Sequence, residues 1–230
     1  MEPTLAELAE DTLAYLLPSP TFEPLERDGY VFVAGRSAAW VTRVRRTDVG
    51  AVRREAQERG TQRVEWWLGP TAPGDADAEL RAAGLVPGET PTLTGMTCVS
   101  PPPVAPGVVV RPAEPEELVA LEHAVWGGEP RPSLPASAAE RYYAAVVGGR
   151  AVGGARSVDM HGAVALMGGV VLPEARGRGV YRALVRARWD DAAARRMPRL
   201  VVQAGELSAP ILATLGFTSH CTVRVYVDRQ

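Results

Sequence analysis

The spacing of apolar and polar residues changes along this chain, and each change predicts a strand, a turn or a helix. Residues 163–172 are almost entirely apolar, which is typical of a strand covered on both faces. Pro173 cannot continue the strand's hydrogen-bond ladder, because it has no N–H. Residues 180–196 then carry apolar side chains at helical spacing. The pattern predicts a buried strand, a short turn and a helix in direct succession.

The rest of the C-terminal half alternates between short strands and helices. The glycine pair Gly148-Gly149 lies between two apolar stretches and predicts a hairpin. In order, the pattern predicts a strand at 108–112, a helix at 114–126, a loop at 127–136, a turn or short helix from Ser137, strands at 142–147 and 151–158, a turn at 159–162, and, after the long helix, a strand at 199–203, a short helix at 208–215 and a strand at 221–228.

The N-terminal half has a shorter series of the same kind. Thr4 and Glu7 form a capping box for a helix whose apolar face runs to Leu16. Asp48 is placed to cap a second helix that ends before Gly60. Strands are predicted at 30–33, 38–44 and 63–69, and a short helix ending in Gly84-Leu85 precedes a strand that contains Cys98.

A proline-rich segment at residues 100–107 is the clearest boundary between the two halves. Its composition predicts an extended, semi-rigid linker. We therefore expect an N-terminal domain at 1–99, a linker at 100–107 and a C-terminal domain at 108–230.

The turn after residues 163–172 has the composition of an anion site. Gly177 and Gly179 carry no Cβ, so the backbone can turn its amides inward and a bulky anion can come close. The first amides of the following helix have no partner inside the helix, and the helix dipole favours an anion by roughly 0.3 to 1 kcal/mol. Arg176 and Arg178 add positive charge for further phosphates. The turn therefore predicts a site for a pyrophosphate.

Two common phosphate-binding motifs do not match this turn. A P-loop ends in Gly-Lys-Ser/Thr, and the chain has no lysine; a dinucleotide fingerprint needs a third glycine and an acid about 20 residues later. The segment RGRGVY at 176–181 instead resembles the Q/R-x-x-G-x-G/A loop of the GNAT superfamily of N-acetyltransferases, whose loop amides hold the pyrophosphate of coenzyme A. Arg176 and Gly179 match the first two fixed positions. Tyr181 departs from the third, where Gly or Ala is usual.

The resemblance extends to the order of elements over residues 107–230. It implies an α/β (α+β) chain with the GNAT acyl-CoA N-acyltransferase fold, a mixed central sheet flanked by helices, preceded by a smaller GNAT-like α/β half. It also implies acetyl-CoA as cosubstrate, with the thioester beside residues 167–170. The implied cofactor-binding residues are Val170, Val171, Leu172, Arg176, Gly177, Arg178, Gly179, Val180, Tyr181 and Ser208. Ser208 could instead be a plain helix cap.

The two halves show a weak internal repeat. RVEWWLG at 63–69 and RLVVQAG at 199–205 are each followed by a short helix, a Gly-Leu or Gly-Phe pair and a strand with a cysteine. At the position of RGRGVY, the first half has RRTDVG at 45–50, in which Asp48 places a negative charge at the helix start. We therefore expect one coenzyme A site, in the second half. Two unrelated α/β segments with generic patterns are the alternative.

The sequence is less informative about catalysis. Acyl transfer to an amine needs a route for the ammonium proton, donors for the oxyanion and an acid for the leaving thiolate. Gly168-Gly169 predicts either a bulge whose amides could bind the acyl carbonyl or close packing against a helix. The family's acid is often a tyrosine before a Gly-Phe pair, where this chain has Leu212, and residues 163–172 hold no carboxylate for the usual base position.

The catalytic residues are therefore left unassigned. A transfer that proceeds mainly by positioning remains compatible with activity. Glu174 belongs to the turn and is expected to orient it. Five residues could line the acceptor groove, although for each of them a place on the surface or in the core is the favoured interpretation: Glu122, His123, Tyr143, Glu206 and Tyr226.

Composition narrows the class of protein. The chain has 230 residues and a net charge of -2, with acids interspersed among the arginines, which argues against a nucleic-acid surface. No apolar run reaches the length of a membrane span and the N-terminus is acidic, so we expect a cytoplasmic protein. Cys98 and Cys221 are expected to be buried free thiols. No metal is expected, because His123, His161 and His220 lack ligand spacing.

Together these features predict an N-acetyltransferase that moves an acetyl group from acetyl-CoA to the amine of a small molecule. A non-catalytic acyl-CoA-binding or scaffolding protein and a peptide or protein N-acetyltransferase are the alternatives. The expected partners are acetyl-CoA and a small amine, with no nucleic acid or membrane, and the chain is expected to be a monomer or homodimer. The acceptor itself cannot be identified from the sequence, because fold does not fix substrate.

Overall fold

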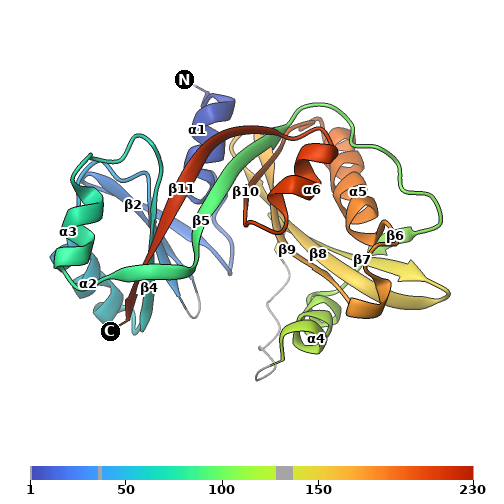
Figure 1. The fold of residues 1–230 in the computed structure, drawn as a ribbon, viewed down its shortest axis with the longest axis horizontal. Coiled ribbons are helices and arrows are strands. Elements are labelled where there is room, and N and C mark those ends of the chain that lie inside the picture. The colour runs from blue at the N-terminus through green and yellow to red at the C-terminus, as the bar shows by residue number, and fades with distance from the viewer. Residues whose placement is uncertain (1, 36–37, 128–136, 230) are drawn as a thin grey trace. The chain divides into compact units, whose positions relative to one another are not determined.

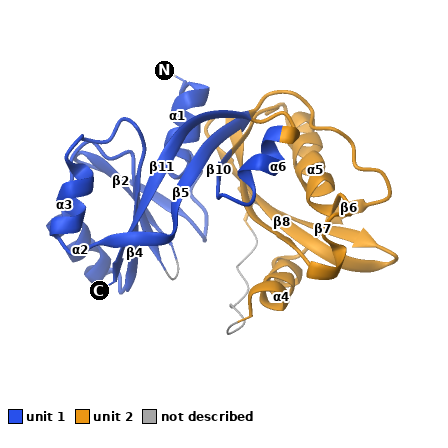
Figure 2. Ribbon diagram, in the orientation of Figure 1, with its two compact units in different colours: residues 1–97, 202–213, 218–230 blue, residues 98–201, 214–217 orange. Residues whose placement is uncertain are grey.

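The computed structural model describes residues 2–35, 38–127 and 137–229 (Figure 1). Two compact units make up the chain (Figure 2): residues 1–97, 202–213 and 218–230 form unit 1, and residues 98–201 and 214–217 form unit 2. The units do not follow chain order, because the last strand, β11 (Thr218–Arg229), pairs antiparallel with two strands of the N-terminal half. The division into consecutive domains at 1–99, 100–107 and 108–230 stays a prediction.

Unit 1 is an α/β unit built on a mixed sheet. Its strands follow the order β1-β2-β3-β4-β11-β5, in which β3 and β4 are parallel and are joined by the helix α2. Trp66 and Phe32 are among the fully buried side chains of its core. Its elements before β11 are α1 (Leu5–Glu10), η1 (Thr12–Tyr15), β1 (Glu23–Arg27), β2 (Tyr30–Ala34), β3 (Ala39–Thr42), α2 (Val49–Glu58), β4 (Arg63–Leu68), α3 (Ala76–Ala82) and β5 (Val86–Cys98).

The first helix is shorter than its apolar pattern predicts. The capping box of Thr4 and Glu7 is present, but α1 ends at Glu10 and a 3-10 turn replaces the rest of the predicted helix. Asp11 causes the break, because its carboxylate accepts the backbone N–H of Arg43 at 2.9 Å rather than remaining on a helix surface. Leu13 and Leu16 are still buried, so the apolar pattern reported burial correctly and helix length wrongly.

Unit 2 contains the strand, turn and helix predicted from residues 163–196. The strand order is β10-β9-β8-β7-β6, with β9 and β10 parallel and the other neighbours antiparallel. Two elements are divided between the units: β10 (Leu200–Ala204) begins in unit 2 and ends in unit 1, and α6 (Ala209–Thr214) lies in unit 1 except for its last residue. The other elements of unit 2 are β6 (Val109–Pro112), α4 (Pro115–Trp126), β7 (Glu140–Val147), β8 (Arg150–Met160), β9 (Ala163–Val171), η2 (Pro173–Ala175) and α5 (Val180–Ala194).

The two helices of unit 2 cover opposite faces of its sheet. Gly154 faces α4, since a Cβ there would lie 2.8 Å from Leu118, whereas Gly153 faces α5, since a Cβ there would lie 2.8 Å from Val180. Neighbouring residues of a strand point to opposite faces, so the pair fixes which face is which. The sheet is therefore a central layer with helices on both sides, as predicted.

Most other elements appear where the pattern places them. The strand expected to end at Val158 continues to Met160, so the turn is confined to His161 and Gly162. The loop predicted at 127–136 lies almost wholly outside the described residues. In the described ranges, no helix is both long and apolar enough to cross a membrane.

Candidate functional site

The turn between β9 and α5 has the backbone of an anion cradle. Gly177 and Gly179 have φ angles of 74° and 78°, a region that side chains with a Cβ rarely adopt. A Cβ built on Gly177 would meet nothing within 4 Å, and one on Gly179 would meet Ala105 at 3.6 Å. The space around these glycines is open, so conformation is the reason for glycine here.

The first turn of α5 has no side-chain cap. Its N-cap is Gly179, which has no side chain to accept a bond from the first amides, and the first turn holds no acidic residue. Such amides are left to solvent or to a ligand, and the positive end of the dipole adds to them. The start of α5 is therefore suited to an external anion.

Arginines lie on the exposed side of the same turn. Arg176 and Arg178 are exposed, and Arg176 Nε donates to the carbonyl of Val171 at 3.4 Å. Glu174 pairs with Arg150, 3.2 Å away, which ties the start of the turn to β8. The turn thus presents cations next to its open amides.

The strand before the turn contains a bulge at Gly168 and Gly169. In the register with β8, Gly154 faces Val170 and Arg156 faces Met167. The single residue Ala155 therefore lies opposite two glycines. Gly168 has a φ of 54°, as a left-handed bulge residue requires. The bulge predicted from the sequence is confirmed, and the helix packing that was its alternative is also present, because a Cβ on Gly169 would lie 2.9 Å from the ring of Tyr181.

The strand β9 pairs with β10 only near its beginning. The parallel register pairs Leu200 with Val164 and Val201 with Ala165, whereas β9 continues to Val171. The side chains of Val170 and Leu172 are buried in the core of unit 2. Only their backbone groups can therefore meet a ligand.

The structure places nine of the ten predicted cofactor residues on one continuous stretch of unit 2, running from the end of β9 through the turn into α5. Ser208 belongs to unit 1, where its hydroxyl donates to the carbonyl of Gly205 at 3.2 Å. The cofactor-binding assignments of all ten residues stay predictions.

A polar cluster lies on the α4 side of the bulge. A Cβ on Gly168 would lie 3.2 Å from Oε1 of Glu122 and 3.9 Å from Cβ of Arg156. Glu140, whose side chain is 1% exposed, accepts a hydrogen bond from the Tyr142 hydroxyl at 2.8 Å and from Arg156 at 3.5 Å. Burial, followed by Glu140, raises the pKa of Tyr142 to about 12. Glu122 is thus the predicted groove residue that the structure places at the bulge.

The other groove candidates do not join this cluster. Tyr143 lies on the α5 face, where its hydroxyl donates to Asp191 at 3.0 Å, and burial raises its pKa to about 12. Tyr226 donates to Asp77 at 2.6 Å within unit 1, to which Glu206 also belongs. His123 is exposed in the last turn of α4. These contacts give both tyrosines structural partners.

Sequence reasoning missed the buried charges around the bulge. Arg188 is 1% exposed on α5, and Glu140 and Arg156 lie on adjacent strands. The sequence feature that could have indicated the burial of Arg188 is its position four residues after Leu184, on the apolar side of the predicted helix. That signal is ambiguous, since arginines also lie along apolar surfaces with their charge in water.

The corresponding turn of the first half is closed by its own side chain. Oδ1 of Asp48 accepts the N–H of Ala51 at 2.9 Å, so the predicted cap of α2 is confirmed. Arg45 donates to Thr71 at 2.6 Å and lies 3.7 Å from Asp11. The amide of Ala51 and the side chain of Arg45 are therefore already engaged inside unit 1.

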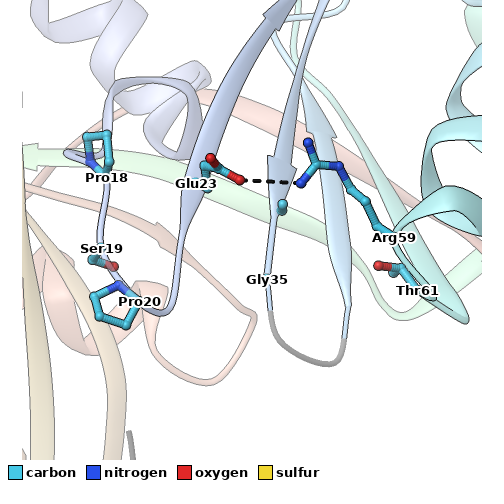
Figure 3. A pocket seen from close by; sticks show the side chains of 8 residues that line it. Pro18, Ser19, Pro20, Glu23, Gly35, Arg59 and Thr61 are labelled. Carbon is cyan, nitrogen blue, oxygen red and sulfur yellow. Dashed lines mark hydrogen bonds and ion pairs between the residues drawn. The ribbon is translucent and has the colours of Figure 1, made fainter. Parts of the chain in front are cut away.

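Unit 1 also has an open pocket of about 600 Å³ (Figure 3). Glu23 and Arg59 face each other across it, with 3.3 Å between Oε2 and Nη1. Its other lining residues are Pro18, Ser19, Pro20, Ala34, Gly35 and Thr61. None of these residues belongs to the glycine-arginine turn, which lies in unit 2.

The thiols and possible metal ligands are dispersed. Both cysteines are free; Cys98 is buried as expected, but Cys221 is only half-buried, because β11 leaves it near the strand's exposed end. Within the described ranges, no three His, Cys, Asp or Glu side chains gather in a group that could hold a metal ion.

Comparison with known proteins identifies a family model and similar folds. Residues 112–217 match the model of the acetyltransferase (GNAT) family. A GCN5-related N-acetyltransferase from Kribbella flavida is similar in structure over 97% of this chain and 95% of its own, with 14% identity and a TM-score of 0.69. One from Sphaerobacter thermophilus is similar over 87% and 80%, with 15% identity and a TM-score of 0.60. No curated protein matches the chain.

A two-part relative is also similar. A tandem GNAT protein from the clavulanic acid biosynthesis pathway aligns over 99% of this chain and 88% of its own, with 16% identity and a TM-score of 0.55. At such identities the similarity shows the fold. It confirms the predicted α/β architecture and fits the prediction of two GNAT-like halves.

Proposed function

We propose that this chain, whose residues 112–217 match the model of the acetyltransferase (GNAT) family, moves an acetyl group from acetyl-CoA to the amine of a small molecule. The observation that carries the proposal is the start of α5. Two left-handed glycines lead into a helix without a side-chain cap, in a family of acyl-CoA-dependent transferases. The geometry suits the pyrophosphate of coenzyme A.

The residues of the turn fit this group by size and by charge. Gly177 has open space where a side chain would be, so a bulky phosphate can approach the backbone. Arg176 and Arg178 are exposed beside it and can pair with phosphate oxygens. We assign pyrophosphate binding to the amides of residues 177–181 and charge neutralisation to the two arginines.

The bulge in β9 suits the acyl end. Acyl-CoA, when bound, supplies an acyl group activated as a thioester. A bulge leaves one residue out of the sheet's hydrogen-bond ladder, so the backbone of Gly168 and Gly169 can donate to a carbonyl from outside the sheet. Fixed donors of this kind favour acyl transfer where negative charge develops on that oxygen.

The acceptor amine needs a group that takes its proton, and we assign this role to Glu122. Its carboxylate lies against Gly168, on the α4 side of the bulge. Glu140 is less suitable, because its side chain is only 1% exposed, whereas Glu122 is half-buried. Glu122, Glu140 and Arg156 together carry one net negative charge beside the bulge, which favours a cationic acceptor such as an ammonium ion over an anionic one.

The proposal is tested by following thiol release from acetyl-CoA with a panel of monoamines, diamines, aminosugars and a lysine-containing peptide. We expect release with at least one small amine, and we expect Glu122→Gln to lower kcat about 100-fold, within the usual range for a proton-transfer group. Glu116→Gln is the matched control, because Glu116 is an exposed acid on the same helix.

Each part of the proposal can fail separately. Release with the peptide alone would replace the small-molecule acceptor by a protein one. Binding of acetyl-CoA without release by any amine would contradict transferase activity. Absence of binding would overturn the cofactor site.

We also propose that the chain has one cofactor site and that the turn at residues 45–50 has none. The support is the bond between Asp48 and Ala51, which fills the helix start with an internal carboxylate. An external phosphate would meet a negative charge there.

A further inference from the structure

Arg188 is a buried cation that lacks a carboxylate partner among the described residues. Its side chain lies between α5 and the sheet, and the residue is 1% exposed. Nε donates to the carbonyl of Leu184 at 3.1 Å and Nη1 to that of Arg156 at 3.2 Å, whereas Nη2 has no hydrogen-bond partner in the described part of the chain. Burial lowers the pKa of Arg188, and Tyr181 and Tyr143 oppose that lowering. Such a group costs stability, which points to a role other than stabilisation.

The contacts of Arg188 lead to the bulge. The carbonyl that accepts the hydrogen bond of Arg188 belongs to Arg156. Arg156 follows the β8 residue that lies opposite the bulge, and it pairs with Met167 of β9. A buried guanidinium bonded to that carbonyl fixes the strand beside the two glycines. It therefore holds the partner strand at the point where the ladder is interrupted.

Tyr181 contacts the bulge from the first turn of α5. It is the second residue of α5, and its ring lies against Gly169 so closely that a Cβ there would be 2.9 Å from Cε2. Ring and glycine complement each other, since only glycine leaves room for the tyrosine. This contact explains why a large residue can occupy the position where the GNAT loop usually has Gly or Ala.

We propose that Tyr181 and Arg188 are positioning residues that lock the Gly168-Gly169 bulge to the first turns of α5. The turn that binds pyrophosphate and the amides that bind the acyl carbonyl are then held by one helix face. The inference rests on the proposed function, because it concerns the amides assigned to the thioester. Neither side chain is assigned contact with the reacting atoms.

The first experiment measures the clamp without any ligand. Gly169→Ala is expected to lower Tm in the unmodified background, because its Cβ would meet the Tyr181 ring, and to have much less effect in a Tyr181→Ala background. Equal losses in both backgrounds would show that ring and glycine are not coupled, and would overturn this part of the proposal.

The second experiment compares the affinities for acetyl-CoA and CoA by calorimetry. A hydrogen bond from the bulge to the acyl carbonyl should make acetyl-CoA bind roughly three- to tenfold more tightly than CoA. Arg188→Met should remove this preference while leaving the Kd for CoA nearly unchanged, and Tyr181→Ala should remove the preference as well. Arg186→Met is the control, since Arg186 lies on the same helix and pairs with Asp190 at its surface.

Hydrogen exchange separates positioning from general loss of structure. In Arg188→Met, faster exchange confined to the amides of residues 167–171 supports the clamp. Unchanged exchange there, or equal acceleration across all strands of unit 2, overturns it. A variant that retains the acetyl preference also overturns it, whereas an unmodified protein that binds neither acetyl-CoA nor CoA overturns the proposed function itself.

Discussion

Two helices of this chain begin in the same topological setting but differ in what meets their first amides. In unit 1, α2 joins the parallel strands β3 and β4; in unit 2, α5 joins the parallel strands β9 and β10. The amide of Ala51 in α2 donates to the carboxylate of Asp48, whereas α5 begins at a left-handed glycine with no side-chain cap. The internal carboxylate stabilises its helix; the open start leaves room for an external anion.

The arginines of the two turns differ in the same sense. Arg45 lies 3.7 Å from the buried Asp11 and donates to Thr71, so its charge is used inside unit 1. Arg178 is exposed beside Gly179. A strand, turn and helix are therefore insufficient for a phosphate site; the start of the helix must also lack an internal side-chain cap.

The largest expected effect comes from closing the open start of α5. Gly179→Glu places a carboxylate at the proposed pyrophosphate position and a side chain at a φ of 78°, so we expect the stabilisation of the protein by CoA to disappear. Thermal unfolding with and without CoA measures the change.

Gly60→Glu is the matched control for this variant. Gly60 has a φ of 67° and open space around it, so the strain of about 1 kcal/mol is similar but no anion site is affected. Equal loss of CoA binding in both variants would attribute the effect to backbone strain.

The next largest effect is a change of stability with pH, caused by the buried carboxyl group of Asp11 near Arg45. Burial, followed by Glu10, raises the pKa of Asp11 from 3.8 to about 6. The folded protein then holds this proton more tightly than the unfolded chain, so stability falls as pH rises from about 4 to 6, by up to about 3 kcal/mol.

The measurement is urea unfolding of the unmodified protein and Asp11→Asn at several pH values. Asparagine keeps an oxygen for the N–H of Arg43 and cannot ionise, so the variant's relative stability should grow between pH 4 and 6 and then level off. A constant difference across this range would show that Asp11 titrates normally.

A smaller effect is expected from the exposed arginines of the second turn. Arg178→Gln should weaken CoA binding roughly three- to tenfold, because an exposed charge contributes modestly and is screened by salt. The difference between variant and unmodified protein should shrink at high salt. Arg199→Gln, which removes an exposed arginine beyond the far end of α5, is the control, and an equally weakened Kd there would indicate a general charge effect.

The smallest effect is expected from opening the first turn. Asp48→Ala removes the cap of α2 and should reduce the free energy of unfolding by about 1 kcal/mol. Chemical denaturation measures this loss. CoA binding at a second site in this variant would show that one carboxylate is all that distinguishes the turns.

The sequence predicted what depends on neighbours along the chain. Gly177 and Gly179 adopt the left-handed conformation that the turn requires, and Asp48 caps the helix that follows it. Gly168 and Gly169 predicted either a bulge or close packing against a helix, and the structure has both.

Features set by distant residues were not predictable. Helix α1 ends early because Asp11 bonds to Arg43, and β11 joins the N-terminal strands through pairs such as Val225 with Trp67. The contact of Glu122 with Gly168 likewise depends on how α4 packs on the sheet. The pattern of neighbouring residues predicts which side chains are buried and which turns form. The contacts between polar groups depend instead on how segments far apart in the sequence pack together.

The central claim is that only the open helix start binds coenzyme A. Its most direct test is the stoichiometry of CoA binding to the unmodified chain, measured by isothermal titration calorimetry. The account predicts one CoA per chain. Two per chain would contradict the contrast between the turns, and none would contradict the site at α5.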